Sequence, residues 1–143
     1  MSKENRILSF LKKQQLMVIS TINNEGKPES AVVSYSEYPS LEIVFGTFND
    51  TRKYKNLKKN QNVSLVIGWG EKEKITLQYE GVAEEIKDKK ELILCKKNHI
   101  SKNPGSESFV NHPKERIFKI KPKWIRYSDL RENPGKIFEI RFD

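Results

Sequence analysis

The chain has 143 residues, which fits one domain, and we treat residues 1–143 as a single unit. Charged residues make up 32% of the chain, and 27 Lys and Arg against 19 Asp and Glu leave a net charge of +8. No apolar run is long enough to cross a membrane or to form a signal-peptide core, and a single cysteine excludes an internal disulfide, so we expect a cytoplasmic protein. The positive charge is compatible with a nucleic-acid partner, with an anionic small ligand, or with a lysine-rich composition alone.

The first third of the chain predicts one helix followed by short strands. Apolar residues at helical spacing indicate an amphipathic helix over the first dozen or so residues. Residues 16–22 are apolar and β-branched, which favours a strand, and the turn-forming residues 24–28 end it. A second strand is expected over residues 28–36. A third follows at residues 41–45, where alternate side chains are apolar.

The middle of the chain predicts two helices around a strand pair. A basic helix over residues 51–59 is inserted between the third and fourth strands. Apolar residues then alternate over residues 63–69 and again over residues 75–80, as expected for strands with one buried face. Asp88 is predicted to cap the next helix, which covers residues 89–97.

The last third predicts a loop and two strands. Residues 98–113 are rich in Asn, Ser, Pro and Gly, which indicates a surface loop with a short helical piece at residues 107–110. A late strand over residues 118–124 is expected to be broken by Pro122, and residues 138–142 alternate once more. Strands joined by short connections favour a mainly β, antiparallel barrel or sandwich flanked by helices.

Few groups in the chain suit metal binding or nucleophilic catalysis. His99, His112 and Cys95 are too few for a His/Cys metal site, so no metal is expected. We expect both histidines to lie on the surface and Cys95 to be inert filler on the apolar side of its helix. No glycine-rich dinucleotide or nucleotide loop is found.

The strongest chemical signal is the predicted start of the basic helix. Arg52 and Lys53 lie in its first turn, where the helix dipole disfavours cations by about 0.3–1 kcal/mol each. A bound phosphate would resolve this conflict, with the hydroxyls of Thr47 and Thr51 as further donors. The alternative is a lysine-rich surface helix capped by Asp50, and the residues alone leave both interpretations open.

The segment around this helix resembles a known family. FGTFNDTRKYKNLKKNQNVSLVI, the EGKP turn before a strand and the ITLQYEGVA strand are similar to the FMN-binding split-barrel family related to pyridoxamine 5′-phosphate oxidase, from about residue 16 to residue 86. The resemblance implies a six-stranded antiparallel split β-barrel of the FMN-binding type. It also implies a homodimer with two FMN sites at the dimer interface.

The resemblance also implies roles for individual residues. Those implied for FMN are Ala31, Val32, Val33 and Ser34 along the isoalloxazine ring, Thr47, Thr51, Arg52 and Lys53 around the phosphate, and Thr76 at the flavin edge, reached from the neighbouring strand. An aromatic side chain of the partner subunit often closes the pocket in this family. Trp69 or Tyr127 could do so here, or could instead fill the core or the interface.

Two positions depart from the family pattern. Ala31 stands where the oxidases have an arginine, Ser36 replaces a lysine, and the oxidases' C-terminal substrate-binding segment is not visible. The resemblance therefore implies an FMN-dependent oxidoreductase for an unidentified small molecule rather than a pyridoxamine phosphate oxidase. Another flavin, a deazaflavin or haem stays open as the cofactor.

Two other functions compete with an oxidoreductase. The first is a flavin-binding or stress-response protein without enzymatic activity. The second is a small basic β-barrel that binds nucleic acid, which is disfavoured because the cations gather at one helix start rather than along a stripe.

Overall fold

The structure, a computed structural model, describes residues 1–143. The strands are β1 (Leu16–Ile22), β2 (Pro28–Ser34), β3 (Ser36–Glu37), β4 (Ile43–Phe48), β5 (Asn62–Ile67), β6 (Ile75–Glu85), β7 (Glu115–Asp129) and β8 (Lys136–Arg141). The helices are α1 (Lys3–Lys13), α2 (Arg52–Lys59), α3 (Lys89–Lys102) and α4 (Glu107–Val110), with a 3₁₀ turn η1 (Pro104–Ser106) before α4. None of these helices is long and apolar enough to span a membrane.

All eight strands form one antiparallel sheet that curls into a split barrel. The strand order is β2-β1-β5-β6-β7-β4-β3, and β8 pairs with β7. Only Tyr35 separates β2 from β3, although the two strands lie at opposite edges of the sheet, so the sheet must curl until its edges approach each other. Tyr35 is fully buried at this crossing, and its hydroxyl donates to the Leu11 carbonyl at 2.7 Å. The predicted mainly β split barrel is confirmed, with eight strands instead of six.

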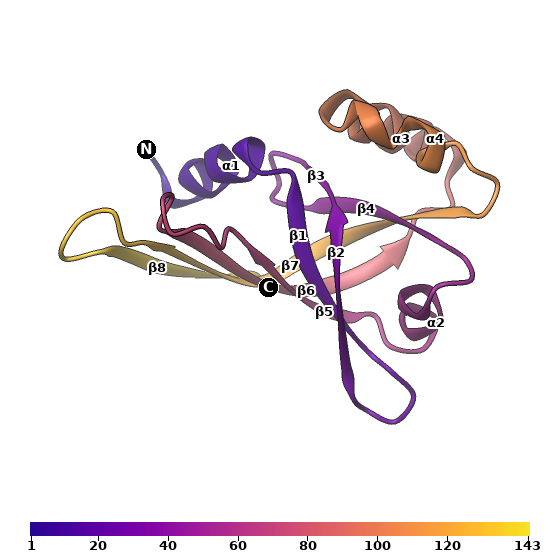
Figure 1. The fold of residues 1–143 in the computed structure, drawn as a ribbon, viewed down its shortest axis with the longest axis horizontal. Coiled ribbons are helices and arrows are strands. Elements are labelled where there is room, and N and C mark those ends of the chain that lie inside the picture. The colour runs from indigo at the N-terminus through magenta and orange to yellow at the C-terminus, as the bar shows by residue number, and fades with distance from the viewer.

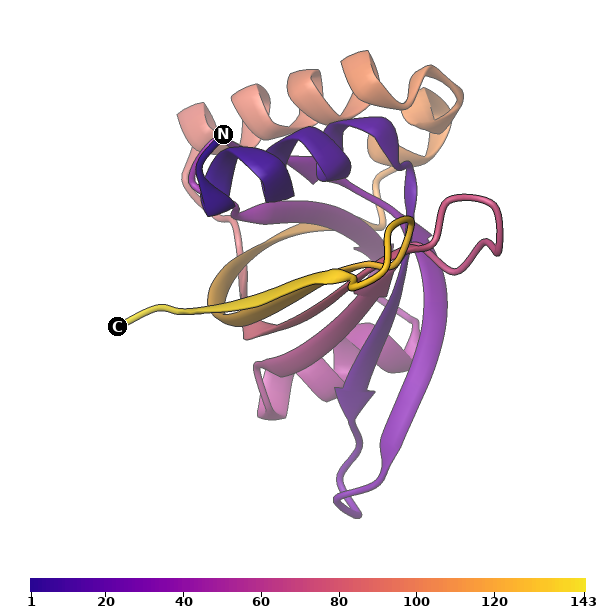
Figure 2. The same ribbon diagram turned by 90° about the vertical axis from the view of Figure 1, so that its left-hand side faces the viewer.

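One core fills the inside of the curled sheet. Alternate residues such as Met17, Ile19 and Leu65 point inward and are at most 2% exposed, as the strand periodicity predicts. Helix α1 closes one side of the core with Ile7 and Leu11. Figure 1 shows α1, α3 and α4 on the upper side of the sheet and α2 on the lower side, and the same arrangement is seen from the left in Figure 2.

The expected break at Pro122 is wrong, because β7 continues through it. Pro122 lies opposite Gly81, where the register between β6 and β7 shifts by one residue. On its other edge β7 pairs with β4 only as far as Ile120 and with β8 only from Trp124. Pro122 therefore lies between two partner strands, where its missing N–H costs no ladder hydrogen bond on that edge.

One of the two predicted helix caps is confirmed. Asp88 caps α3 as expected, accepting from the Glu91 N–H at 3.0 Å, and α4 covers the expected residues. Helix α2 is capped by Thr51 instead of Asp50, whose carboxylate pairs with Lys114 at 3.2 Å.

Candidate functional site

A cavity of about 440 Å³ lies where the split in the barrel is open. Strand β3 is only two residues long and pairs with β4 at Ile43 and Val44, so the later part of β4 has no strand beside it on that edge. The free edge of β4 at Gly46–Phe48 and the free edge of β2 at Val32–Ser34 both line the cavity. Helix α2 begins at one end of the cavity, and η1 and α4 form the other. Unpaired backbone groups and apolar side chains thus line the same space.

The phosphate residues predicted from the sequence meet at the start of α2. The hydroxyls of Thr47 and Thr51 lie 2.7 Å apart, and Thr51 accepts from the Tyr54 N–H at 3.2 Å as the helix cap. The backbone N–H groups of Arg52 and Lys53 donate to no protein acceptor, as expected in a first helical turn. These donors lie beside one another at the cavity.

Lys53 is the cation that the structure brings to this cavity. Its side chain is half-buried and forms no ion pair. Burial lowers the pKa of its ammonium group, and the neighbouring Arg52 lowers it further. A buried ammonium without a counter-ion is stabilised by an anion, so the start of α2 fits a phosphate group.

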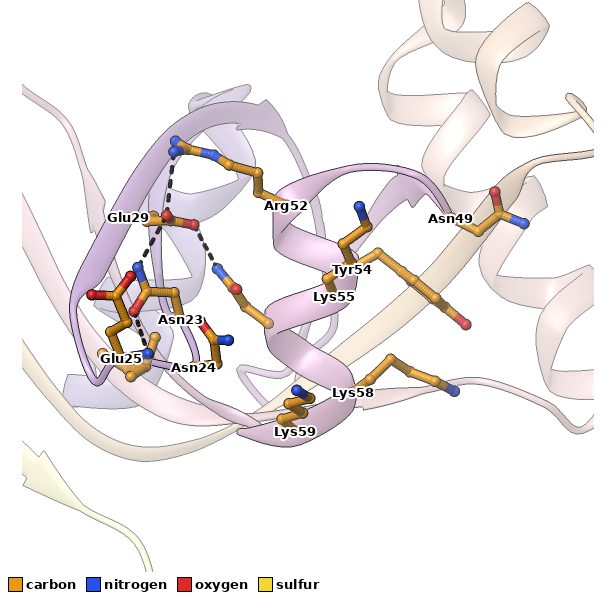
Figure 3. A pocket seen from close by; sticks show the side chains of 12 residues that line it. Asn23, Asn24, Glu25, Glu29, Asn49, Arg52, Tyr54, Lys55, Lys58 and Lys59 are labelled. Carbon is orange, nitrogen blue, oxygen red and sulfur yellow. Dashed lines mark hydrogen bonds and ion pairs between the residues drawn. The ribbon is translucent and has the colours of Figure 1, made fainter.

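Arg52 is already paired with a carboxylate of the chain. Its guanidinium donates to the Glu29 carboxylate at 3.2 Å, and Glu29 also accepts from Asn56 at 2.8 Å. Figure 3 shows this contact in a second groove, of about 610 Å³, between α2 and the β1–β2 turn. The hydrogen bonds from Asn56 and Asn23, with the Arg52 charge, hold the pKa of Glu29 below its usual value.

The remaining residues implied by the family resemblance are spread over the molecule. Ala31 faces a small hollow of about 120 Å³ beside Lys53. Thr76 lies on β6 opposite Ser128, with β1 and β5 between β6 and β2, and it does not line the cavity. Tyr127 is 2% exposed and stacks on Phe138 in the core at 5.0 Å between ring centroids. Trp69 lies after β5, in a loop, and is 57% exposed.

The sequence did not single out the carboxyl and aromatic groups of the cavity. Glu115 lies over Gly46, and a Cβ atom at Gly46 would stand 2.2 Å from its Oε1 atom, so only glycine leaves room for this carboxyl. Burial raises the pKa of Glu115 to about 7, against the smaller effect of Lys96. Phe48 and Phe109 form an apolar wall, with their ring centroids 6.3 Å apart.

His99 also lines the cavity, and its expected surface location is wrong. It is 3% exposed on the inner face of α3, near the equally buried Cys95. The other histidine, His112, is exposed as expected and stacks on Phe48 with 4.6 Å between ring centroids. Cys95 is buried as expected, with its Sγ atom 3.0 Å from the Tyr38 hydroxyl.

Comparisons with known proteins agree with this arrangement. A pyridoxine/pyridoxamine 5′-phosphate oxidase of Leptospira biflexa is 26% identical over 125 residues, which are 87% of this chain and 48% of that protein. A general stress protein 26 from Bacillus anthracis has a TM-score of 0.76 and 21% identity, covering 98% of this chain and all of that one. A haem-binding protein from Mycobacterium smegmatis has a TM-score of 0.84 and 14% identity, covering 99% of this chain and 58% of that one. These two structures show the fold alone.

The family follows from the extent of the sequence match. The family model described as pyridoxamine 5′-phosphate oxidase matches residues 4–129, which include every strand except β8. The chain spans less than half the length of the curated oxidases that it matches, so their activity does not transfer with the fold. The match over most of the chain, together with the split barrel, shows that this protein belongs to the pyridoxamine 5′-phosphate oxidase family.

Proposed function

We propose that the cavity between β2 and β4 binds FMN and that the protein uses it in redox chemistry on a small molecule. The observation that carries this proposal is Lys53, a half-buried cation without an ion-pair partner at the start of a helix. The hydroxyls of Thr47 and Thr51 can rotate their protons toward a bound phosphate. The adjacent N–H groups would donate to the same anion.

The rest of the cavity suits a planar ring system. Its volume of about 440 Å³ lies within the usual range for small-molecule sites, about 300–1,000 Å³. Val32 and Val33 on one side and Phe48 and Phe109 on the other offer apolar surface, and the free edge of β2 offers backbone donors and acceptors. Bound FMN would supply hydride or electron transfer, whereas the protein holds and orients it.

We further propose a homodimer formed through the outer face of β1, β2 and β5. Val18 lies opposite both Val32 and Val66, so three valines form one row across this face. Val32 is 59% exposed, and it also lines the cavity, so a partner seated here would border the ligand. Trp69 and Leu16 line a neighbouring groove and extend the apolar surface. Trp69 of one subunit would then be placed to close the partner's cavity.

Haem is the second candidate ligand, and His112 is the observation that favours it. The Nδ1 atom of His112 accepts from the Lys114 N–H at 3.1 Å, while its Nε2 atom has no partner. The ring stacks on Phe48, which lines the cavity, so Nε2 would be free to bind an iron held beside that wall. The fold shared with the Mycobacterium smegmatis protein agrees with this alternative.

The test is a titration of the purified protein with FMN, followed by flavin fluorescence. Lys53→Ala should weaken FMN binding about 10- to 100-fold, because a charged hydrogen bond contributes about 1.5–3 kcal/mol. Lys55→Ala is the matched control, since Lys55 lies on the same helix but lines the other groove. Equal FMN affinities of the two variants would show that Lys53 does not contact the bound FMN.

The same preparation separates the candidate functions. Binding of hemin with a Soret shift, and no binding of FMN, would show that the ligand is haem and not a flavin. Binding of FMN without its reduction by nicotinamide donors would favour the stress-response alternative, in which flavin is held without turnover.

A further inference from the structure

Three side chains form a hydrogen-bonded row that ends at the cavity. The Ser36 hydroxyl lies 3.2 Å from Nδ1 of His99, and Nε2 of His99 lies 3.3 Å from the Ser34 hydroxyl. Ser36 and His99 are each 3% exposed, whereas Ser34 is partly exposed and lines the cavity. The row thus has one end in the protein interior and one end at the proposed ligand.

The protonation state of His99 is set by its surroundings. Burial, together with the smaller effect of the positive charge of Lys102, lowers the pKa of His99 to about 4. The imidazole is therefore neutral near pH 7, with a proton on one nitrogen only. One ring nitrogen must donate and the other must accept.

The buried Ser36 hydroxyl determines which ring nitrogen of His99 donates a hydrogen bond and which accepts one. The Ser36 hydroxyl has no side-chain partner other than His99, and a buried hydroxyl proton without an acceptor is costly. Ser36 therefore donates to Nδ1 of His99. It follows that the proton of His99 is on Nε2, which donates to the oxygen of Ser34.

We propose that Ser36, His99 and Ser34 form a directed relay that presents the Ser34 hydroxyl as a hydrogen-bond donor to the ligand in the cavity. With its oxygen accepting from His99, Ser34 has its own proton free to point into the cavity. The group that it recognises is an uncharged acceptor on a ring, a carbonyl oxygen or an unprotonated nitrogen. Ser34 is the binding residue, and Ser36 and His99 are positioning residues.

This inference rests on the proposed ligand cavity, but its first test needs no ligand. Nitrogen-15 NMR of the free protein reports which ring nitrogen of His99 carries the proton. We expect the Nε2–H tautomer and no protonation of His99 between pH 8 and pH 5. An Nδ1–H tautomer, or titration near pH 6.5, would overturn the relay.

The second test is a double-mutant cycle on FMN affinity. Ser34→Ala should weaken binding about 2- to 10-fold, the usual effect of losing one hydrogen bond. Ser36→Ala should weaken binding by a similar factor when Ser34 is present, and should have no effect in the Ser34→Ala background, because it acts only through that hydroxyl. Additive effects of the two substitutions would contradict the relay.

A matched control lies on the same strand. Ser30→Ala removes a β2 hydroxyl that contacts Ser20 at 2.8 Å, and it should leave FMN affinity unchanged. If the unmodified protein binds no FMN, the proposed function fails, and the tautomer of His99 still decides whether the relay is directed as described.

Discussion

Glu115 is the residue whose charge most affects the cavity. Its carboxyl forms no ion pair and no side-chain hydrogen bond, and it shares the cavity with Lys53 and His99. Because its pKa is raised to about 7, it is divided between acid and carboxylate near neutral pH. The neutral acid can accompany a bound phosphate, whereas the carboxylate would repel it.

This raised pKa predicts a loss of stability at higher pH. The native state binds the Glu115 proton more tightly than the unfolded chain, whose pKa is near the ordinary 4.5, so the free energy of unfolding falls as the pH rises from about 4.5 through 7. Glu115→Gln should remove this fall, which is of order 1–2 kcal/mol for a carboxyl that is partly solvated.

Urea unfolding at pH 5 and pH 8 measures the effect. Glu107→Gln is the control, because Glu107 is exposed on α4 and should leave the pH dependence as it is. Parallel pH profiles for the unmodified protein and Glu115→Gln would show that Glu115 titrates normally.

Sequence reasoning missed two residues of the cavity, His99 and Glu115, and only the burial of His99 could have been predicted from the sequence. Leu92, Cys95 and His99 recur at helical spacing, so extending the apolar side of the helix by one turn predicts a buried His99. Glu115 carries no such signal. Its position over Gly46 depends on β7 pairing with β4, two strands that are separated by nearly half of the chain.

Among the elements, the start of α2 shows what a local pattern can predict. The dipole conflict at Arg52 and Lys53 predicted an anionic partner for the two cations, and the structure supplies one for Arg52, whereas the partner of Lys53 stays a prediction. The partner of Arg52, Glu29, comes from β2, 23 residues earlier in the chain, and no sequence pattern singles it out. The conflict therefore predicts the existence of a site, and the fold decides which cation is left for a ligand.

The register shift between β6 and β7 opposite Pro122 can be tested by a substitution at Gly81. A Cβ atom at Gly81 would lie 2.5 Å from the Lys121 carbonyl oxygen and 2.8 Å from a methyl group of Ile120. Gly81→Ala should therefore destabilise the protein by about 1–3 kcal/mol, because the backbone of β7 must move. Thermal or urea unfolding measures this loss.

Gly70→Ala is the matched control for that substitution. A Cβ atom at Gly70 meets nothing within 4 Å, so the change should be neutral or slightly stabilising. Equal stabilities of the two variants would show that β6 and β7 lie farther apart at Gly81 than described.

For the whole molecule, the curl of the sheet links the cavity to the outer face. The edge strand β2 carries Ser34 and Val33 at the cavity and Val32 in the exposed valine row. A β-sheet edge and an apolar face left open on one strand favour association, and a partner there would also exclude water from the ligand. Strand periodicity predicted the two faces of each strand, but not that β2 would be the edge beside the cavity.

The proposed dimer gives the last prediction. Val66 is 38% exposed at the β5 end of the valine row and does not line the cavity, so Val66→Glu tests the face without touching the ligand site. A carboxylate trapped in an apolar contact costs of order 3 kcal/mol, which should weaken the dimer at least about 100-fold. Analytical ultracentrifugation should then show a folded monomer at concentrations where the unmodified protein is dimeric. Ile93→Glu, at a 70% exposed position on α3, should leave the dimer intact. A dimer that survives Val66→Glu and is lost with Ile93→Glu would place the interface on α3.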